Sequence, residues 1–473
     1  MSFLVPITLL GWPFVAIALF TVLPPRRAVL AAYMLAWLFL PQAGIDVPGF
    51  PDIDKINATS LGALAGVLLF DAQRLSRFSF SWVDIPVIVW CLTSMLSALT
   101  NELPPDATSP LYDGISGLVK DSLTWGVPYL IGRLYFNNLV ALRELAIGIF
   151  LGGLIYAPLC LFEMKMSPCL HQFVYGYHPS SFLMTLRYGG YRPMVFMQHG
   201  LMLSMWMTCT ALVGAWLWKT GSLRRIFNLP MGPIVLVLIV VTVLCKSTGA
   251  IALLVLGLGV LYLNSIVRSN ALLIAIAIIT PIYMTVRIQG IWSGKQLVDL
   301  AYKIDSERGD SLAGRLENED MLNQHAAKKS LFGWGGWGRW RVHDPKTGED
   351  ITVSDGMWVI ARGERGLVGL ASVTALVLLP YGLLLARVRA RYWTHPWLAA
   401  PAALAVILML YSIDNLFNAM LNPVYLLAAG GLSGFYLAFP QVVARERHAR
   451  AVQRLAHVAQ HAPQGPRPLV SVD

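Results

Sequence analysis

Two arginines in the stretch TLRYGGYRPMVFMQHG, residues 185–200, have the chemistry needed to grip a phosphate group. A guanidinium group offers paired N–H donors that match the spacing of phosphate oxygens. Arg187 and Arg192 flank a Gly-Gly pair, and glycine lets a ligand approach the backbone closely. Because the stretch leads directly into an apolar segment, we expect both arginines at a membrane surface. The alternative role there is a side chain that extends to lipid headgroups.

His199 and Lys246 stand in similar places, each at the edge of an apolar run. An imidazole beside a phosphate site is a candidate general base for the proton of a hydroxyl group. Lys246 opens the sequence Lys-Ser-Thr-Gly, which separates two apolar runs. It is either a further cation near the same phosphate or the lysine of a tight turn whose ammonium reaches the lipid surface.

The polar stretch 303–363 is the second region with reactive side chains, and it is rich in charge, glycine and tryptophan. A loop longer than about 15 residues is usually either functional or disordered. The tryptophans between Trp334 and Trp358 argue against disorder, because disordered segments are poor in aromatic residues. We therefore predict a structured loop outside the membrane that carries the chemistry.

Arg308 and Arg315 lie seven residues apart near the start of this stretch. Asp310 or Ser311 is suited to cap a helix that runs to about Ser330. If that helix starts early, the two arginines share one of its faces. They are then either directed at an anionic ligand or paired with acidic residues of the loop.

Residues 333–340, GWGGWGRW, alternate glycine with tryptophan but match no nucleotide-binding motif. Aromatic faces can hold sugar rings, although tryptophan is also common at membrane interfaces. Two candidate general bases follow, of which Asp355 is preferred over His343, since a single loop histidine is more often simply solvated. The expected glycan-binding tryptophans are Trp334, Trp337 and Trp340.

A polar stripe at helical spacing lies near the end of the chain and contains Asp414, Asn415, Asn418 and Asn422. Residues four apart lie on the same face of a helix. We expect Asp414 and Asn415 to form a wall of the same cavity. Hydrogen bonding between helices is an equal alternative.

The composition is that of a protein that crosses a membrane many times. Of 473 residues, 56% are hydrophobic and 13% are charged, whereas soluble domains carry roughly 25% charge. Much of the net charge of +10 lies in short loops beside apolar runs, which sets membrane topology and does not indicate nucleic-acid binding. The five cysteines show no CxxC and no metal-ligand spacing, so we predict no disulfide framework, no metal and no cofactor.

We predict an all-α polytopic fold, since a span needs about 20 mostly apolar residues and about thirteen such segments are present. With the N-terminus outside, every short basic loop falls on one face, which the positive-inside rule assigns to the cytoplasm. Residues 1–440 then form a single transmembrane domain, whose external loops 162–199 and 289–357 make the site, and 441–473 form a basic cytoplasmic tail. The predicted spans are 3–23, 28–44, 57–70, 82–99, 115–134, 140–161, 200–218, 230–247, 249–266, 271–288, 358–386, 396–413 and 421–440.

This pattern resembles the O-antigen ligase and Wzy-type polysaccharide polymerase superfamily. RYGGYRPMVFMQHGLMLSMW resembles the family's arginine-bearing segment that enters a span, and Arg315 followed by FGWGGWG, SDGMW and GERGLVGL resembles the motifs of its large loop. Ser354-Asp355-Gly356 stands where ligases usually show His-Asn, and Met197-Gln198-His199 replaces an Asn-rich segment. These differences favour the exopolysaccharide polymerase branch.

The resemblance implies a GT-C-like fold and metal-independent, inverting glycosyl transfer from an undecaprenyl-diphosphate-linked glycan at the periplasmic face of a bacterial inner membrane. Arg192 and Arg315 would hold the donor diphosphate, supported by Arg187, Arg308 and Lys246. Asp355, or failing it His199 or His343, would accept the proton. The expected partners are membrane lipid, a flippase and a chain-length regulator, with no nucleic acid. The alternatives are a ligase that moves finished glycan to a lipid acceptor and a transporter of lipid-linked sugar.

Overall fold

The protein is described here by a computed structural model that covers residues 2–47, 50–102 and 109–439. The predicted tail 441–473 lies outside these residues. The described chain is predominantly helical, and its strands are confined to short antiparallel hairpins. These hairpins are β1–β2 (Gly44–Val47 and Phe50–Asp54), β3–β4 (Leu186–Arg187 and Gly190–Tyr191) and β5–β6 (Arg225–Ile226 and Leu229–Pro230). The predicted all-α class is therefore confirmed.

The helices follow the apolar runs of the sequence, because a segment in lipid must satisfy its own backbone hydrogen bonds. In chain order they are α1 (Leu4–Val22), α2 (Pro25–Phe39), α3 (Lys55–Phe70), α4 (Ala72–Ser76), α5 (Ile85–Thr100), α6 (Pro110–Asp121), α7 (Val127–Tyr135), α8 (Leu139–Met166), α9 (Leu170–Tyr175), α10 (Gly200–Lys219), α11 (Met231–Leu244), α12 (Thr248–Val267), α13 (Asn270–Ala277), α14 (Ile279–Ile288), α15 (Lys295–Ile304), α16 (Ser306–Ala327), α17 (Met357–Arg387), α18 (Ala399–Asp414) and a last helix, Pro423–Phe439.

Seven helical stretches among the described residues are long and apolar enough to cross a membrane. This supports a membrane protein, while the number thirteen stays a prediction. Four further apolar helices are shorter, and the predicted span 115–134 is divided between α6, a π-helical turn at Ser122–Gly126 and α7. The seven stretches are Leu4–Val22, Trp82–Thr100, Leu139–Met166, Gly200–Lys219, Thr248–Val267, Asn270–Ile288 and Met357–Arg387.

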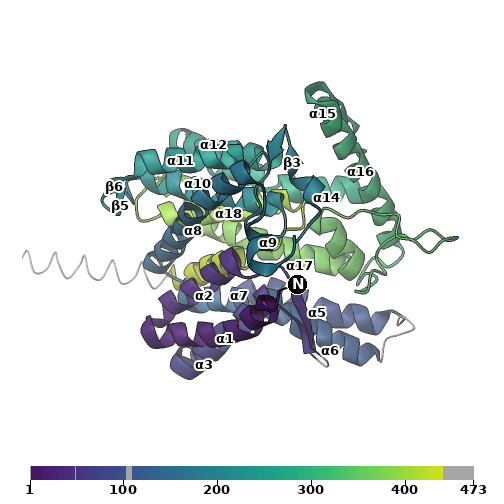
Figure 1. Cartoon of the computed structure of the whole chain (residues 1–473), viewed down its shortest axis with the longest axis horizontal. Coiled ribbons are helices and arrows are strands. Elements are labelled where there is room, and N and C mark those ends of the chain that lie inside the picture. The colour runs from purple at the N-terminus through teal and green to yellow at the C-terminus, as the bar shows by residue number, and fades with distance from the viewer. Residues whose placement is uncertain (1, 48–49, 103–108, 440–473) are drawn as a thin grey trace, which may run out of the picture.

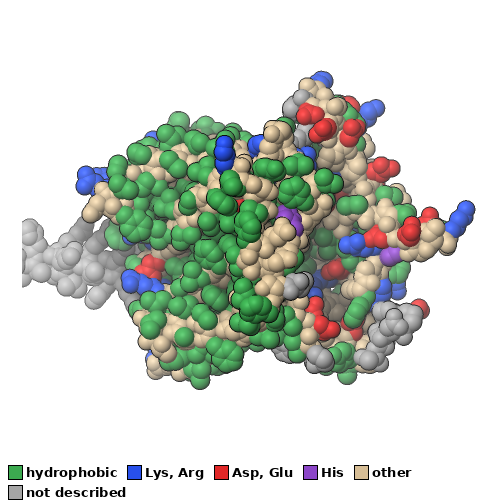
Figure 2. Space-filling model, viewed as in Figure 1, with side chains coloured by type: hydrophobic (Ala, Val, Ile, Leu, Met, Phe, Trp, Pro, Cys, Tyr) green, Lys and Arg blue, Asp and Glu red, His purple; other side chains and the backbone are tan. Residues whose placement is uncertain are grey.

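Helix α10 lies at the centre of the helical body and packs against α8, α11, α12 and α18. The hairpin β5–β6 and the α15–α16 pair lie at opposite ends of the molecule (Figure 1). Apolar side chains cover most of the body, whereas charged side chains gather over α15, α16 and the loop that follows (Figure 2). Residues 357–363 of the polar stretch belong to α17, and the external position of the loop before them stays a prediction.

Helix α17 is interrupted near its start, where the loop between α16 and α17 packs against it. We call this loop, residues 328–356, the glycine-rich loop. Gly366 has φ 63°, and a side chain there would collide with the backbone of Leu331. The freed backbone groups pair with the loop: the N–H of Leu367 donates to the carbonyl of Ser330 at 2.8 Å, and that of Trp334 to Gly363 at 2.8 Å. Only glycine tolerates such a conformation without strain, so the interruption fixes how the loop meets the membrane domain.

Candidate functional site

Arg187 and Arg192 are held by the hairpin β3–β4, in which Leu186 pairs with Tyr191 and Arg187 with Gly190. The intervening turn has positive φ at Tyr188 and Gly189, as a tight two-residue hairpin requires. Arg192 is buried, and its Nη2 donates to the carbonyl of Lys246 at 3.0 Å. A Cβ at Gly200 would collide with the aliphatic stem of Arg192, so the guanidinium takes its place only because residue 200 is glycine.

The carboxylate of Glu163, at the end of α8, stabilises the turn between Arg192 and His199 through hydrogen bonds. One carboxylate oxygen, Oε2, accepts from the N–H groups of Met194 at 2.8 Å and Val195 at 2.7 Å. Val195 has φ 54°, which is unusual for a β-branched residue and requires such support. Sequence reasoning missed Glu163, although a carboxylate at the end of an apolar run, shortly before an arginine loop, is a signal that could have revealed it.

His199 caps α10: its Nδ1 accepts the N–H of Leu201 at 3.2 Å. Its Nε2 lies 3.4 Å from the sulfur of Met184. Burial and the neighbouring Arg192 lower the pKa of His199, so the ring is neutral at neutral pH. Because Nδ1 is the acceptor, the proton of the neutral ring lies on Nε2. His199 is therefore better suited to donate a hydrogen bond to a ligand than to act as a base.

Arg315 comes from α16, which begins earlier and ends earlier than predicted, at Ser306 and Ala327, with Asp305 as its capping residue. The Nε of Arg315 lies 3.0 Å from Oδ2 of Asp355, and its Nη1 donates to the carbonyl of Phe417 at 3.4 Å. Both side chains of the pair are partly exposed, at 30% and 40%. An ion pair this open to solvent contributes little stability and can exchange partners.

Helix α16 is tied to the membrane domain by a separate, buried ion pair. Nε of Arg287 lies 3.2 Å from Glu319, and Nη2 lies 2.9 Å from Asp320. The hydroxyl of Tyr283 also donates to Glu319 at 2.9 Å. Glu319 lies four residues after Arg315, on the same face of α16, so these contacts fix the position of the face that carries Arg315.

Side chains at β3–β4, α10 and α16 meet around one cavity of about 770 Å³, which we call the arginine cavity. Arg187, Arg192 and Arg315 line it together with His199 and Asp355, although these residues come from stretches more than 100 positions apart. Asp414 lies there too, and its Oδ1 accepts from the amide of Asn418 at 2.7 Å. Much of the remaining wall is apolar and includes Leu201, Met205, Leu253, Leu297, Leu300, Leu312, Ile413 and Met420.

Lys246 does not line this cavity. Its Nζ donates to the carbonyl of Arg187 at 3.1 Å and so secures the hairpin β3–β4. The residues after it form the wall instead, because α12 begins there and Ser247, Thr248 and Gly249 face the cavity. The first N–H groups of a helix have no partner within the helix and carry partial positive charge. The break in the sequence thus contributes Ser247, Thr248 and Gly249 to the cavity wall, whereas Lys246 contacts the hairpin.

The three candidate tryptophans do not line the arginine cavity either. Trp334 stacks on His325, with ring centroids 4.4 Å apart, and Trp340 is buried against Gly363. Trp337 is 72% exposed and lines a second cavity. Trp334 and Trp340 therefore pack the loop against α17 where that helix is interrupted.

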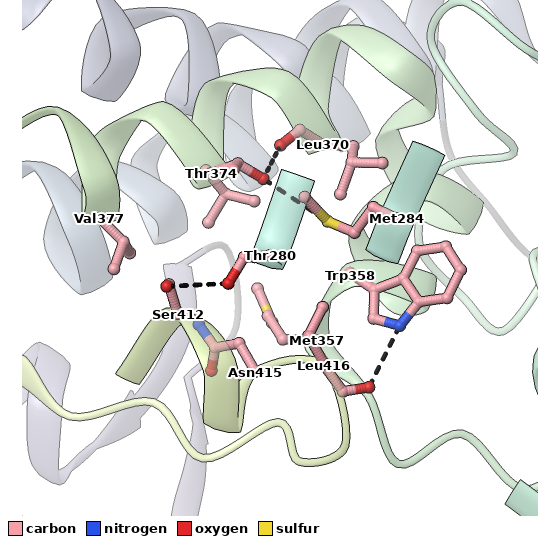
Figure 3. Close-up of a pocket in the computed structure, with 11 residues that line it drawn as sticks. Thr280, Met284, Met357, Trp358, Leu370, Thr374, Val377, Ser412, Asn415 and Leu416 are labelled. Atoms are coloured by element: carbon pink, nitrogen blue, oxygen red, sulfur yellow. Dashed lines mark hydrogen bonds between the residues drawn. The ribbon is translucent and has the colours of Figure 1, made fainter. Parts of the chain in front are cut away.

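His343 and Asn415 are also placed apart from the arginine cavity. His343 is exposed and forms an isolated β-bridge with Asp350. Asn415 lines a small enclosed pocket, together with Met284 and Trp358 (Figure 3). That pocket holds only about 20 Å³, which is room for water but not for a sugar. Arg308 lies in α16, but its side chain is outside the described part of the structure.

The electrostatics of the arginine cavity suit an anion with an apolar body. Three guanidinium groups and the starts of α10 and α12 outweigh the carboxylates of Asp355 and Asp414. Among the described residues, no group of three or more His, Cys, Asp or Glu side chains could hold a metal ion. Neither the comparison with protein-family models nor that with characterised proteins gives a match for this chain.

Proposed function

We propose that the protein is a glycosyltransferase that polymerises undecaprenyl-diphosphate-linked repeat units into an exopolysaccharide or O-antigen. The observation that carries this proposal is the meeting of Arg187, Arg192 and Arg315 in one cavity. The same cavity holds carboxylates for proton transfer and an apolar wall for a lipid. These are the requirements of a reaction that expels a lipid-linked diphosphate.

The reaction is an attack of an acceptor hydroxyl on the anomeric carbon of the donor sugar. The new C–O bond forms as the bond from the anomeric carbon to the diphosphate oxygen breaks, which inverts the configuration. Negative charge grows on the departing diphosphate, and preorganised cations stabilise it most effectively. Arg192 and Arg315 supply that charge in this proposal, with Arg187 and the first turn of α12 in support.

Asp355 is the proposed general base, because its Oδ2 already faces Arg315 at 3.0 Å. Without donor, the ion pair holds both groups in place. A bound diphosphate competes for the guanidinium of Arg315 and so releases the carboxylate to accept the hydroxyl proton. Donor binding and activation of the base are thereby coupled through one arginine.

The apolar wall of the cavity accounts for the lipid part of the donor. Leu201 and Leu253 lie on helices of the membrane domain, while Leu297 and Leu300 come from α15. A polyisoprenoid chain gains roughly 0.8 kcal/mol for each CH₂ group that it buries. The cavity can therefore hold the diphosphate at its polar end and the first isoprene units along its apolar side.

We further propose that the cavity opens toward the periplasm of the bacterial inner membrane. The exposed basic residues Arg224 and Arg225 lie at the β5–β6 end, opposite α15 and α16 (Figure 1). The positive-inside rule assigns such a basic hairpin to the cytoplasm. The N–H of Ser2 donates to the carbonyl of Tyr175 at 3.0 Å, so the N-terminus lies beside the predicted external loop 162–199.

The test is glycan analysis in the native host, with the chromosomal gene replaced by Arg192→Ala or Arg315→Ala. We expect both variants to insert normally, to make no polymer and to accumulate single lipid-linked repeats. The matched control is Arg225→Ala, an exposed arginine at the opposite end, which should make normal polymer. Near-normal polymer in both cavity variants would refute the proposal.

The same experiment separates the alternatives. Loss of a ligase leaves long chains that are not attached to lipid, whereas loss of a polymerase leaves single repeats. A transporter would need a gradient, so glycosyl transfer by the purified protein in detergent would exclude that role.

A further inference from the structure

The second cavity differs from the first in the charge of its lining. It has a volume of about 500 Å³ and lies between β1–β2, α5, α6, the glycine-rich loop and the start of α17. Five carboxylates line it, against two cations, Lys120 and Arg365. The carboxylates are those of Asp46, Asp52, Asp113, Asp121 and Glu364. A lining of this charge disfavours a phosphate.

The spacing of these acids also disfavours a metal ion. Within the described residues, no three of them approach closely enough to hold one. The carboxylates of Asp46 and Asp52 are exposed and make no hydrogen bond or ion pair with any described residue. Dispersed acceptors of this kind match the hydroxyl groups of an uncharged ligand, which are spread over a ring or chain.

Trp337 supplies the observation that decides the ligand class. It is a bulky residue with φ 61°, a strained conformation, and it is nevertheless 72% exposed at the cavity. Its Nε1 donates to Asp113 at 2.8 Å, which fixes the indole beside that carboxylate. Tyr112 lines the same cavity and is 50% exposed. Aromatic faces next to carboxylates are suited to sugars, since the rings pack on the C–H faces while the acids accept from the hydroxyl groups.

We propose that this cavity binds uncharged sugar residues of a glycan chain, separately from the arginine cavity. Its role as the holding site for the acceptor or growing chain rests on the proposed function. The same loop joins the two sites, because Trp337 lines one cavity and Asp355 the other. A glycan held near Trp337 is thus linked through residues 338–354 of this loop to the residue proposed to activate its hydroxyl.

Gly336 offers a way to block the cavity without disturbing the fold. It lines the cavity, and a Cβ built there meets no atom within 4 Å, so Gly336→Leu projects into open space. Trp337→Gly removes the aromatic face and relieves the strained backbone at the same time. The matched control is Gly382→Leu, since a Cβ at Gly382 in α17 also meets no atom within 4 Å and that residue lines neither cavity.

The experiment measures binding by calorimetry to purified full-length protein in detergent. The probe is the neutral fraction of the oligosaccharides that mild acid releases from the host's own surface polysaccharide. We expect wild type and Gly382→Leu to bind alike, and Gly336→Leu and Trp337→Gly to bind at least about tenfold more weakly. Arg315→Ala should bind like wild type. Absence of binding to wild type, or equal binding by all variants, would overturn the inference.

Failure of this inference is distinguishable from failure of the proposed function. If wild type does not bind the oligosaccharides while Arg192→Ala still abolishes polymer, the second site is wrong and the function stands. If binding depends on Trp337 but both arginine variants make normal polymer, the sugar site stands and the polymerase proposal fails.

Discussion

The arginine cavity and the second cavity are built from similar numbers of polar groups but with opposite charge. The arginine cavity sets three guanidinium groups against two carboxylates and adds a long apolar wall. The second cavity sets five carboxylates against two cations and adds Trp337 and Tyr112. In the proposed function, a lipid diphosphate and an uncharged sugar need these different surroundings, so the contrast would allow one protein to hold donor and acceptor without competition between them.

Arg315 in the arginine cavity and Arg365 in the second cavity differ in how firmly they are held. Arg365 in the second cavity is fully engaged: its Nη1 and Nη2 each lie 2.9 Å from Asp121, and its guanidinium lies 3.8 Å from the ring of Trp90. Among the described residues, Arg315 meets the partly exposed Asp355 and a carbonyl at 3.4 Å. Burial with a full set of partners marks a structural group, whereas a loosely held cation remains available to a ligand.

The largest expected effect comes from Asp355→Asn. Loss of a general base should lower the rate of glycosyl transfer by roughly 10²–10⁴-fold, while donor affinity should rise, because the neutral amide no longer competes with the diphosphate for Arg315. Transfer by purified protein, at saturating donor, measures it. Asp350→Asn is the matched control, because Asp350 pairs with Arg341 in the same loop but lines neither cavity. A rate within about threefold of wild type for Asp355→Asn would remove Asp355 from the mechanism.

The contrast between Arg365 and Arg315 predicts losses of folding stability of different size when each is removed. Arg365→Ala leaves the buried Asp121 without its partner and should destabilise the protein by about 3–5 kcal/mol. Arg315→Ala opens a solvent-exposed pair and should change stability by less than about 1 kcal/mol. Unfolding in mixed detergent micelles compares the two. Equal losses of stability would erase the distinction between structural and available arginines.

A smaller effect is expected from Gly200→Ala, which acts on Arg192 without altering it. The added methyl group collides with the stem of Arg192, and a flexible side chain can move aside, so the fold should persist. Displacing the guanidinium should reduce transfer by about tenfold, the loss of one charge-assisted hydrogen bond. The matched control is Gly259→Ala in α12, where a Cβ meets no atom within 4 Å. Unchanged transfer by Gly200→Ala would show that the exact position of Arg192 is unimportant.

The smallest effect concerns pH. Burial lowers the pKa of His199 below its ordinary value of 6.5. Between the two pKa values the unfolded chain binds a proton that the folded protein does not, so stability should fall as pH decreases below about 6.5. His199→Gln removes this contribution, and its melting temperature should decline less than that of wild type between about pH 7 and pH 5. Parallel declines would show that His199 does not titrate in this way.

The sequence predicted the helical class and several residues of the arginine cavity, because these follow from apolar run length and from the rarity of charge near membranes. It could not predict the interruption of α17. Gly366 is one of several glycines in an apolar helix, and only the docked loop reveals its left-handed backbone. The glycan site predicted from the sequence therefore includes Trp334 and Trp340, whereas in the structure both side chains pack the loop against neighbouring helices.

Contacts between residues far apart in the sequence could not be predicted either. The role of Lys246 depends on carbonyls of β3–β4 nearly 60 positions away, and that of Glu163 on a turn about 30 positions away. No local spacing encodes such contacts. The second cavity was invisible for the same reason, since it joins β1–β2, α6 and the glycine-rich loop from three distant parts of the chain.

The most direct measurement is a double-mutant cycle for diphosphate binding. Wild type, Arg192→Ala, Arg315→Ala and the double variant would be titrated with undecaprenyl diphosphate in nanodiscs. If both arginines grip one diphosphate, each single variant should bind at least about tenfold more weakly than wild type, and the cycle gives the coupling between the two groups. Wild-type affinity in either single variant would contradict the claim that the two guanidinium groups share one ligand.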